Sequence, residues 1–165
     1  MKIIGIDPGR KGAIVCLDDE TMIARYANLP YRTDGVIEFD RLNQWTQGDH
    51  CPILLEDVHG RGKWGSNSVF TFGCNYGQLR AWIVIMKRSH ILVLPKAWQK
   101  IAHAGLNEID PKVNSFISFQ RLNPRAKIRK TQDGIVDAFH IARYGIIYYS
   151  KNTHFKDDWE FRCYE

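Results

Sequence analysis

Short runs of consecutive apolar residues alternate along this chain with stretches in which apolar residues recur every three or four positions. Runs at 2–6, 13–17, 21–29, 53–55 and 91–94 predict five strands. Continuous apolar runs of this length are typical of strands that are buried on both faces. The first three runs are separated only by short turns, so we expect them to pair as neighbouring antiparallel strands.

Helical periodicity marks five further segments, at 35–45, 68–86, 95–103, 110–122 and 132–145. Asp34 is a candidate cap for the first of them, and Asp110 followed by Pro111 suits the start of the fourth. Strands and helices that alternate in this way predict an α/β protein.

The length of 165 residues is typical of a single domain. We expect a core over about 1–150 and a C-terminal tail over 151–165, with Trp159 and Phe161 packed on the surface of the domain.

Two glycines interrupt the long segment at 68–86. Gly73 and Gly77 lie four residues apart on one face of the predicted helix. Each costs about 1 kcal/mol relative to alanine inside a helix. A close approach of another backbone explains them best, and we expect this helix to form the contact of a homodimer.

The composition is that of a globular protein, with 44% hydrophobic and 25% charged residues and a formal net charge of +5. A moderately basic chain is compatible with a polyanionic partner. The four cysteines form no CxxC pair, which is typical of reduced thiols. No apolar run approaches the roughly 20 residues of a membrane span, and no signal peptide is recognisable. We therefore expect a cytoplasmic protein with no membrane segment.

Acidic residues follow directly after two of the buried strands. Asp7 ends the first run, and Glu56 ends the run at 53–55. A carboxylate in such a place is unfavourable unless a cation or hydrogen-bond donors satisfy it. Neighbouring strand residues point to opposite faces, so we expect Glu56 rather than Asp57 to face a site. The alternative for Asp7 is a turn residue that caps its own backbone.

Two more acids, Asp133 and Asp137, lie four residues apart on the last predicted helix and share one face. Like charges at this spacing repel, and a cation would remove that cost. The alternative is that Asp133 only caps the helix and Asp137 is an exposed helix residue. His140 can approach the same face, so a site of three carboxylates completed by His140 or a water also stays open.

Glycine, basic and aromatic residues are concentrated in the segment 59–68. One interpretation is a plain connector. We favour a loop that contacts nucleic acid through Arg61, Lys63 and Trp64, with Trp64 and the nearby Phe70 stacking on unpaired bases.

A second basic segment, 121–130, lies just before the last pair of acids. It is either a solvated loop or a surface that faces phosphates. We favour the second and assign four side chains to DNA binding: Arg125, Lys127, Arg129 and Lys130.

Taken in order, several short motifs resemble one family. They are the opening Ile-Gly-Ile-Asp-Pro-Gly, the strand ending Leu-Leu-Glu, Ser68-x4-Gly73-x3-Gly77, Pro95-x2-Trp98-Gln99-Lys100, and Asp133-Gly-x2-Asp137-Ala. This arrangement, which covers most of 1–149, resembles the RuvC-like Holliday junction resolvases of the phage and poxvirus type, in the ribonuclease H-like superfamily.

The resemblance implies a ribonuclease H-like α/β fold, with a mixed five-stranded sheet flanked by helices. It implies that Asp7, Glu56, Asp133 and Asp137 are catalytic metal ligands. It also implies a basic residue beside the scissile phosphate, here the catalytic candidate Lys100 or Lys96, with Lys96 also counted among the DNA contacts. In many family members the last two ligands are three residues apart, but position 134 here is glycine.

The chemistry of the four acids agrees with this resemblance. Carboxylates are the ligands that hard divalent cations prefer, and phosphodiester hydrolysis of this kind uses two Mg²⁺ or Mn²⁺ ions about 4 Å apart. We expect a metal-dependent endonuclease that nicks four-way DNA junctions as a homodimer, with no small-molecule cofactor. The alternatives are a flap, fork or ribonuclease H-like nuclease, a non-catalytic junction-binding module, and an actin-like phosphate-binding domain.

Overall fold

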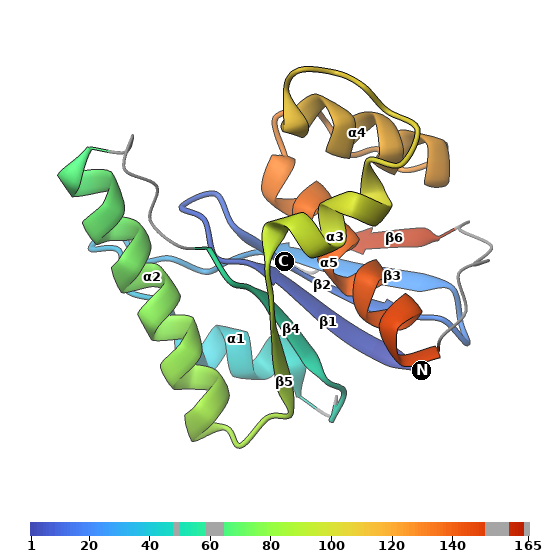
Figure 1. Ribbon diagram of the computed structural model, residues 1–165. Coiled ribbons are helices and arrows are strands. Elements are labelled where there is room, and N and C mark those ends of the chain that lie inside the picture. Colours follow the sequence, from blue (N-terminus) through green and yellow to red (C-terminus); the bar gives the residue numbers. More distant parts are fainter. Residues whose placement is uncertain (48–49, 59–64, 151–158, 164–165) are drawn as a thin grey trace.

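A mixed six-stranded sheet forms the centre of the protein, with helices on both of its faces (Figure 1). The computed structural model describes residues 1–47, 50–58, 65–150 and 159–163. The strand order is β5-β4-β1-β2-β3-β6. The strands are β1 (Lys2–Asp7), β2 (Ala13–Asp18), β3 (Ile23–Asn28), β4 (Ile53–Glu56), β5 (His90–Val93) and β6 (Glu160–Cys163).

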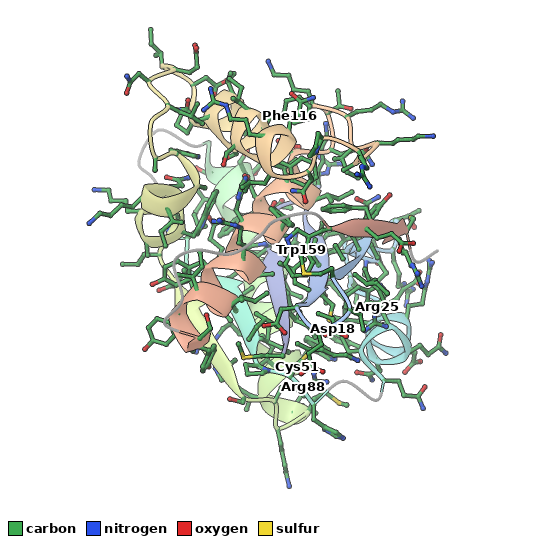
Figure 2. All side chains as sticks on the ribbon, turned by 90° about the vertical axis from the view of Figure 1, so that its right-hand side faces the viewer. Asp18, Arg25, Cys51, Arg88, Phe116 and Trp159 are labelled. Carbon is green, nitrogen blue, oxygen red and sulfur yellow. The ribbon has the colours of Figure 1, made fainter. Side chains whose placement is uncertain are left out.

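The first three strands form an antiparallel meander, and β4 and β5 extend the sheet in parallel beyond β1. The predicted α/β class with a mixed sheet is therefore confirmed. The sixth strand was not expected: β6 pairs in parallel with β3. Trp159, labelled in Figure 2, is only 4% exposed and joins the main core, so the prediction that it packs on the surface was wrong. Phe161 is partly buried against the same core.

Five helices occur in the described part of the chain. They are α1 (Phe39–Thr46), α2 (Ser66–Ile85), α3 (Pro95–Ala102), α4 (Pro111–Leu122) and α5 (Asp133–Ser150). One hydrophobic core lies between the sheet and α1 and α2. A second lies between the opposite face and α3, α4 and α5. Alternate residues of β1 divide between them, since Ile3 belongs to one core and Ile4 and Ile6 to the other.

Helix α1 begins four residues later than its periodicity predicted. Gly35 has a positive φ of 83°, and Ile37 forms a β-bridge with Tyr31 instead of a helical turn. Asp34 accepts a hydrogen bond from the Val36 N–H, so it caps a turn and not the helix. The apolar residues at 36–45 therefore belong to two structures, a buried β-bridge at Ile37 and a short helix after it, and not to one continuous helix.

Helix α5 packs closely against β1, β2 and β4 because small residues lie at the contact. A Cβ atom on Gly5 would collide with the backbone of Ala138 and Ala142, and one on Gly145 would lie 2.8 Å from both Ile3 and Leu54. Side chains at Gly5 or Gly145 would push the helix away from the sheet. This tight packing sets the position of the acids at the first turns of α5.

Helix α2 has an apolar face that the other described residues leave uncovered. No atom lies within 4 Å of a Cβ built on Gly73 or Gly77, so the described residues give no packing reason for these glycines. Phe70 and Val84, on the same stripe, are 74% and 60% exposed.

Candidate active site

The first two acids of the site lie side by side at the ends of β1 and β4. The parallel register pairs Ile6 with Leu55, so Asp7 and Glu56 are next in line. Ile6 and Leu55 point into the core beneath α1 and α2. Because successive strand residues point to opposite faces, Asp7 and Glu56 point toward the face that carries α5. Asp57 lies beyond Glu56 and accepts a 2.6 Å hydrogen bond from the Tyr76 hydroxyl of α2, on the opposite face. The choice of Glu56 over Asp57 thus agrees with the geometry.

The other two acids come from α5, and their charges act on the strand acids. Burial and, to a lesser extent, the charge of Asp133 raise the pKa of Asp7 to about 6. Burial also raises the pKa of Asp137 well above its ordinary value, and Asp7, Glu56 and Asp133 add to this shift. Electrostatic coupling of this strength requires proximity, so the structure brings the four predicted acids together.

Each of the four acids accepts a hydrogen bond from a different residue. The Gly9 N–H donates to Asp7 Oδ1 at 3.1 Å, and Trp98 Nε1 donates to Glu56 Oε1 at 2.9 Å. Asp137 is hydrogen-bonded to the Ser115 side chain, and Asp133 Oδ2 to Lys112 Nζ. These donors come from the β1–β2 turn, from α3 and from α4.

Lys112 is the functional candidate that the sequence did not reveal. Its side chain is 65% exposed, yet its ammonium group forms an ion pair with Asp133. The hydrogen bond that Lys112 donates to Asp133 is the main cause of the raised pKa of Lys112, and the charges of Asp137 and Asp7 contribute. Asp110 and Pro111 correctly indicated the start of α4 and thus the first-turn position of Lys112. No sequence pattern indicated that this turn lies beside α5.

Lys96 and Lys100 are both exposed on α3. In the described part of the chain, neither shows a hydrogen bond or ion pair with the four acids. Their proximity to a scissile phosphate stays a prediction, and Lys112 is the lysine that the structure places at the site.

Gly134 explains why the two α5 acids are four residues apart. A Cβ atom at position 134 would collide with the Lys11 carbonyl oxygen and would lie 3.2 Å from Asp7 Oδ2. A side chain cannot be accommodated there, so an acid three residues before Asp137 is sterically excluded. The acid is found one residue earlier, at Asp133.

The surroundings of His140 do not match a ligand role, whereas the choice between ligand and helix cap for Asp133 stays open to experiment. Asp133 is the first residue of α5 and forms an ion pair with Lys112. His140 is 2% exposed, and its Nε2 donates to the Ser115 carbonyl oxygen at 2.9 Å. Burial lowers the pKa of His140 to about 3. This histidine lies behind the acids, against Trp98, and not among them.

The donor set suits hard divalent cations, which take oxygen ligands. Asp7 and Asp137 have pKa values raised by burial and by neighbouring carboxylates, so a bound cation would remove an unfavourable interaction. The residues that would hold it are Asp7, Glu56 and Asp137, with Asp133 at the rim. Within the described ranges, no three acidic, histidine or cysteine side chains already form a metal-binding arrangement.

The predicted DNA-binding residues divide into two groups. Arg61, Lys63 and Trp64 lie outside the described residues. The others are exposed: Phe70 in the first turns of α2, and Arg125, Lys127, Arg129 and Lys130 in the connection between α4 and α5.

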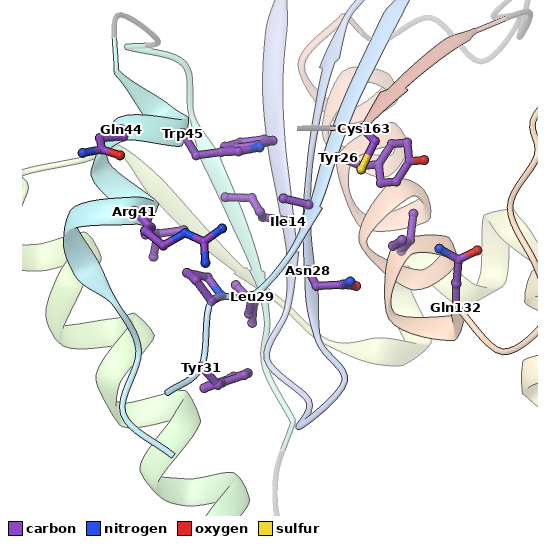
Figure 3. A pocket seen from close by; sticks show the side chains of 14 residues that line it. Ile14, Tyr26, Asn28, Leu29, Tyr31, Arg41, Gln44, Trp45, Gln132 and Cys163 are labelled. Carbon is purple, nitrogen blue, oxygen red and sulfur yellow. The ribbon is translucent and has the colours of Figure 1, made fainter. Parts of the chain in front are cut away.

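A pocket of about 600 Å³ lies next to the acids and not around them. Figure 3 shows that it surrounds the end of β3, between α1 and α5. Tyr31 links the two places, because its hydroxyl lies 3.3 Å from the Gly9 carbonyl oxygen in the turn after Asp7. Burial and the charge of Asp7 raise the pKa of Tyr31. The four acids themselves are absent from the pocket lining.

All four cysteines are free, as their spacing predicted. In the portion of the chain that the structure covers, no helix has both the length and the apolar character needed to cross a bilayer.

The six-stranded sheet with α5 across β1 and the acids at the strand ends defines a ribonuclease H-like fold. Among solved structures, the chain is similar to RuvC of Thermus thermophilus, both alone and in complex with a Holliday junction substrate. The complex superimposes with a TM-score of 0.64 and 12% identity, and RuvC alone with 0.62 and 16%. Both alignments cover 93% of this chain and 98% of the other. The sequence matches no protein-family model and no curated protein. The chain thus has the fold of RuvC, as the motifs predicted.

Proposed function

We propose that this protein is a metal-dependent endonuclease that cleaves branched DNA, with four-way junctions as the preferred substrate. The observation that carries the proposal is the convergence of four carboxylates, from β1, β4 and α5, at one edge of a RuvC-like sheet. Two largely buried acids with raised pKa values suit a cation site better than a simple binding module.

The residues of the site divide the chemical work. Asp7, Glu56 and Asp137 would hold the cations deep in the site, with Asp133 at the rim. Bound Mg²⁺ or Mn²⁺ would supply a water of lowered pKa and positive charge for the leaving oxygen of the phosphodiester. Lys112, which is paired with Asp133 in the metal-free site, would be available to a phosphate oxygen if a cation bound that carboxylate.

The neighbouring surface suits a DNA backbone. The exposed cations Arg125, Lys127, Arg129 and Lys130 lie in the segment that leads directly into α5 and its acids. Each lysine or arginine that neutralises a phosphate contributes to affinity by releasing counterions. Phe70, exposed on α2, provides a ring on which an unpaired base at the branch point can stack.

The uncovered face of α2 supports a homodimer. Gly73, Gly77, Ala81 and Val84 recur at three- and four-residue steps and are all exposed, while Asn75, Leu79, Trp82 and Ile83 face the core. The two glycines would allow a second helix to approach closely. A two-fold dimer would place two active sites on two strands of a two-fold junction.

A gel assay with labelled four-way junction, flap, duplex and RNA–DNA hybrid tests the proposal. We expect nicking of the junction in Mg²⁺ or Mn²⁺ and none in excess EDTA. Asp7→Asn and Glu56→Gln should abolish nicking and retain junction binding in a mobility-shift assay. Junction cleavage that persists in EDTA would exclude the metal mechanism, and preferred cleavage of the hybrid or flap would reassign the substrate.

A further inference from the structure

A layer of aromatic and polar side chains lies behind the acids, formed by Trp98 and His103 at α3, Ser115 on α4 and His140 on α5. Trp98, Ser115 and His140 are each 3% exposed or less. The four are connected by hydrogen bonds and ring contacts, and two of them donate to acids of the site. Side chains that are buried, polar and linked in this way have fixed orientations.

Trp98 has no freedom to move its N–H away from Glu56. Its ring lies parallel to His140, with centroids 6.0 Å apart and an interplanar angle of 6°, and it meets the edge of His103 at 6.0 Å. The indole N–H therefore stays on Glu56 Oε1, at 2.9 Å. A glutamate has three flexible torsions, and a bond to one oxygen defines where the other oxygen points.

Ser115 is constrained in the same manner. Its backbone carbonyl accepts from His140 Nε2 at 2.9 Å, and its hydroxyl oxygen lies 3.0 Å from His103 Nε2. The hydroxyl has one proton to donate. With Asp137 ionised, as a cation ligand must be, that proton goes to the carboxylate, and the hydroxyl oxygen accepts from the His103 Nε2–H. Ser115 is thus oriented from both sides.

We propose that Trp98 and Ser115 are positioning residues. Trp98 holds one oxygen of Glu56 and Ser115 holds one oxygen of Asp137, so that the second oxygen of each carboxylate faces the cations. Helices α3 and α4 then belong to the metal-binding apparatus and are not merely a cover for the core. The inference rests on the proposed function, because it takes these acids to be metal ligands. Loss of such supporting bonds typically weakens metal binding by about 10–100-fold.

Mn²⁺ binding, followed by electron paramagnetic resonance without DNA, tests this independently of catalysis. Trp98→Phe keeps a buried ring and loses the N–H, and Ser115→Ala loses only the hydroxyl. The chain offers matched controls. Trp82 is 3% exposed and donates a 2.7 Å hydrogen bond to Asn43 far from the acids, so Trp82→Phe makes the same chemical change elsewhere. Ser118→Ala removes another hydroxyl that is buried on α4.

We expect Trp98→Phe and Ser115→Ala to bind Mn²⁺ about 10–100-fold more weakly than the wild type. Trp82→Phe and Ser118→Ala should stay within about twofold of it, and Ser115→Thr, which retains the hydroxyl, should recover most of the affinity. Thermal melts without metal identify a variant that fails to fold. If Trp98→Phe fails to fold, the comparison of Ser115→Ala with Ser115→Thr and Ser118→Ala tests the proposal.

The outcomes separate this inference from the proposed function. If the wild type binds no Mn²⁺, the metal-dependent function itself is wrong. If the wild type binds Mn²⁺ and both test variants bind as tightly as their controls, the acids are ligands but Trp98 and Ser115 do not position them.

Discussion

Replacing Asp7 with asparagine should stabilise the metal-free protein at neutral pH, although it destroys the proposed site. Burial and the charge of Asp133 raise the pKa of Asp7 from 3.8 to about 6, so the folded state resists its ionisation. A difference of about two pKa units corresponds to about 3 kcal/mol. Because Asp7 retains some contact with solvent, water screens part of this, and we expect a gain of about 1–2 kcal/mol.

The pH dependence follows from the direction of the shift. Below pH 3.8, Asp7 is protonated in both states and carries no penalty. As the pH rises toward 6, the unfolded chain releases the proton freely and the folded protein does not, so folding stability falls. Above that range the penalty is complete. The advantage of Asp7→Asn should therefore be full at about pH 7.5 and fall to about one third at about pH 4.5.

Urea unfolding in EDTA at these two pH values measures the effect. Asp18→Asn is the matched control, because Asp18 ends β2 as Asp7 ends β1 and accepts from the backbone N–H two residues on, as Asp7 does. It should change stability by less than about 0.5 kcal/mol. Adding Mg²⁺ should stabilise the wild type and reduce the difference in unfolding free energy between it and Asp7→Asn. Equal stability of wild type and Asp7→Asn at pH 7.5 in EDTA would refute the raised pKa and the repulsion that explains it.

Three further outcomes test the acids, the aromatic contact and the dimer. Asp133→Asn should fold, bind junction DNA and cleave it at least about 100-fold more slowly than the wild type. If Asp133→Asn cleaves at a near wild-type rate while Asp137→Asn is inactive, the metal site has only three carboxylate ligands. Phe70→Ala should slow junction cleavage more than cleavage of a pre-opened substrate, since a lost base stack is worth about 1–3 kcal/mol, and equal losses would contradict strand opening. Gly77→Arg should raise helix propensity yet convert a dimer to a monomer by light scattering; a monomeric wild type that still nicks junctions in pairs would refute the interface.

The strands and their acids were predictable from the sequence because each depends on local order. Asp7 and Glu56 directly follow apolar runs, and the alternation of side chains along a strand selects Glu56 over Asp57. β6 was not predictable in this way. It has four residues, two of them charged and exposed, and it is held by backbone pairing with β3 far away in the sequence. Periodicity also misplaced the start of α1, because the apolar residue Ile37 is buried by a bridge to Tyr31.

The side chains that hydrogen-bond to the acids could not be predicted from the sequence, because they too are distant from their partners along the chain. Trp98 and Glu56 are 42 residues apart, and Lys112 and Asp133 are 21 apart. Such pairs depend on how α3 and α4 pack on α5. Proline and aspartate signals gave the start of α4 correctly, but no periodicity specifies which end of a neighbouring helix that start will meet.

Lys112 and Ser115, one turn apart on α4, contact Asp133 and Asp137, one turn apart on α5. The two pairs differ in depth. The inner partner, Ser115, is buried and neutral, so Asp137 gains a donor but no ion pair, and its pKa stays raised. The outer acid, Asp133, is nearer to solvent and already forms an ion pair. Under the proposed function, a cation would gain most from Asp137, Asp7 and Glu56, whose repulsion it would relieve. It would compete with Lys112 at Asp133. Release of Lys112 from Asp133 would then accompany full loading of the site, leaving a free ammonium group at the rim where a DNA phosphate would arrive.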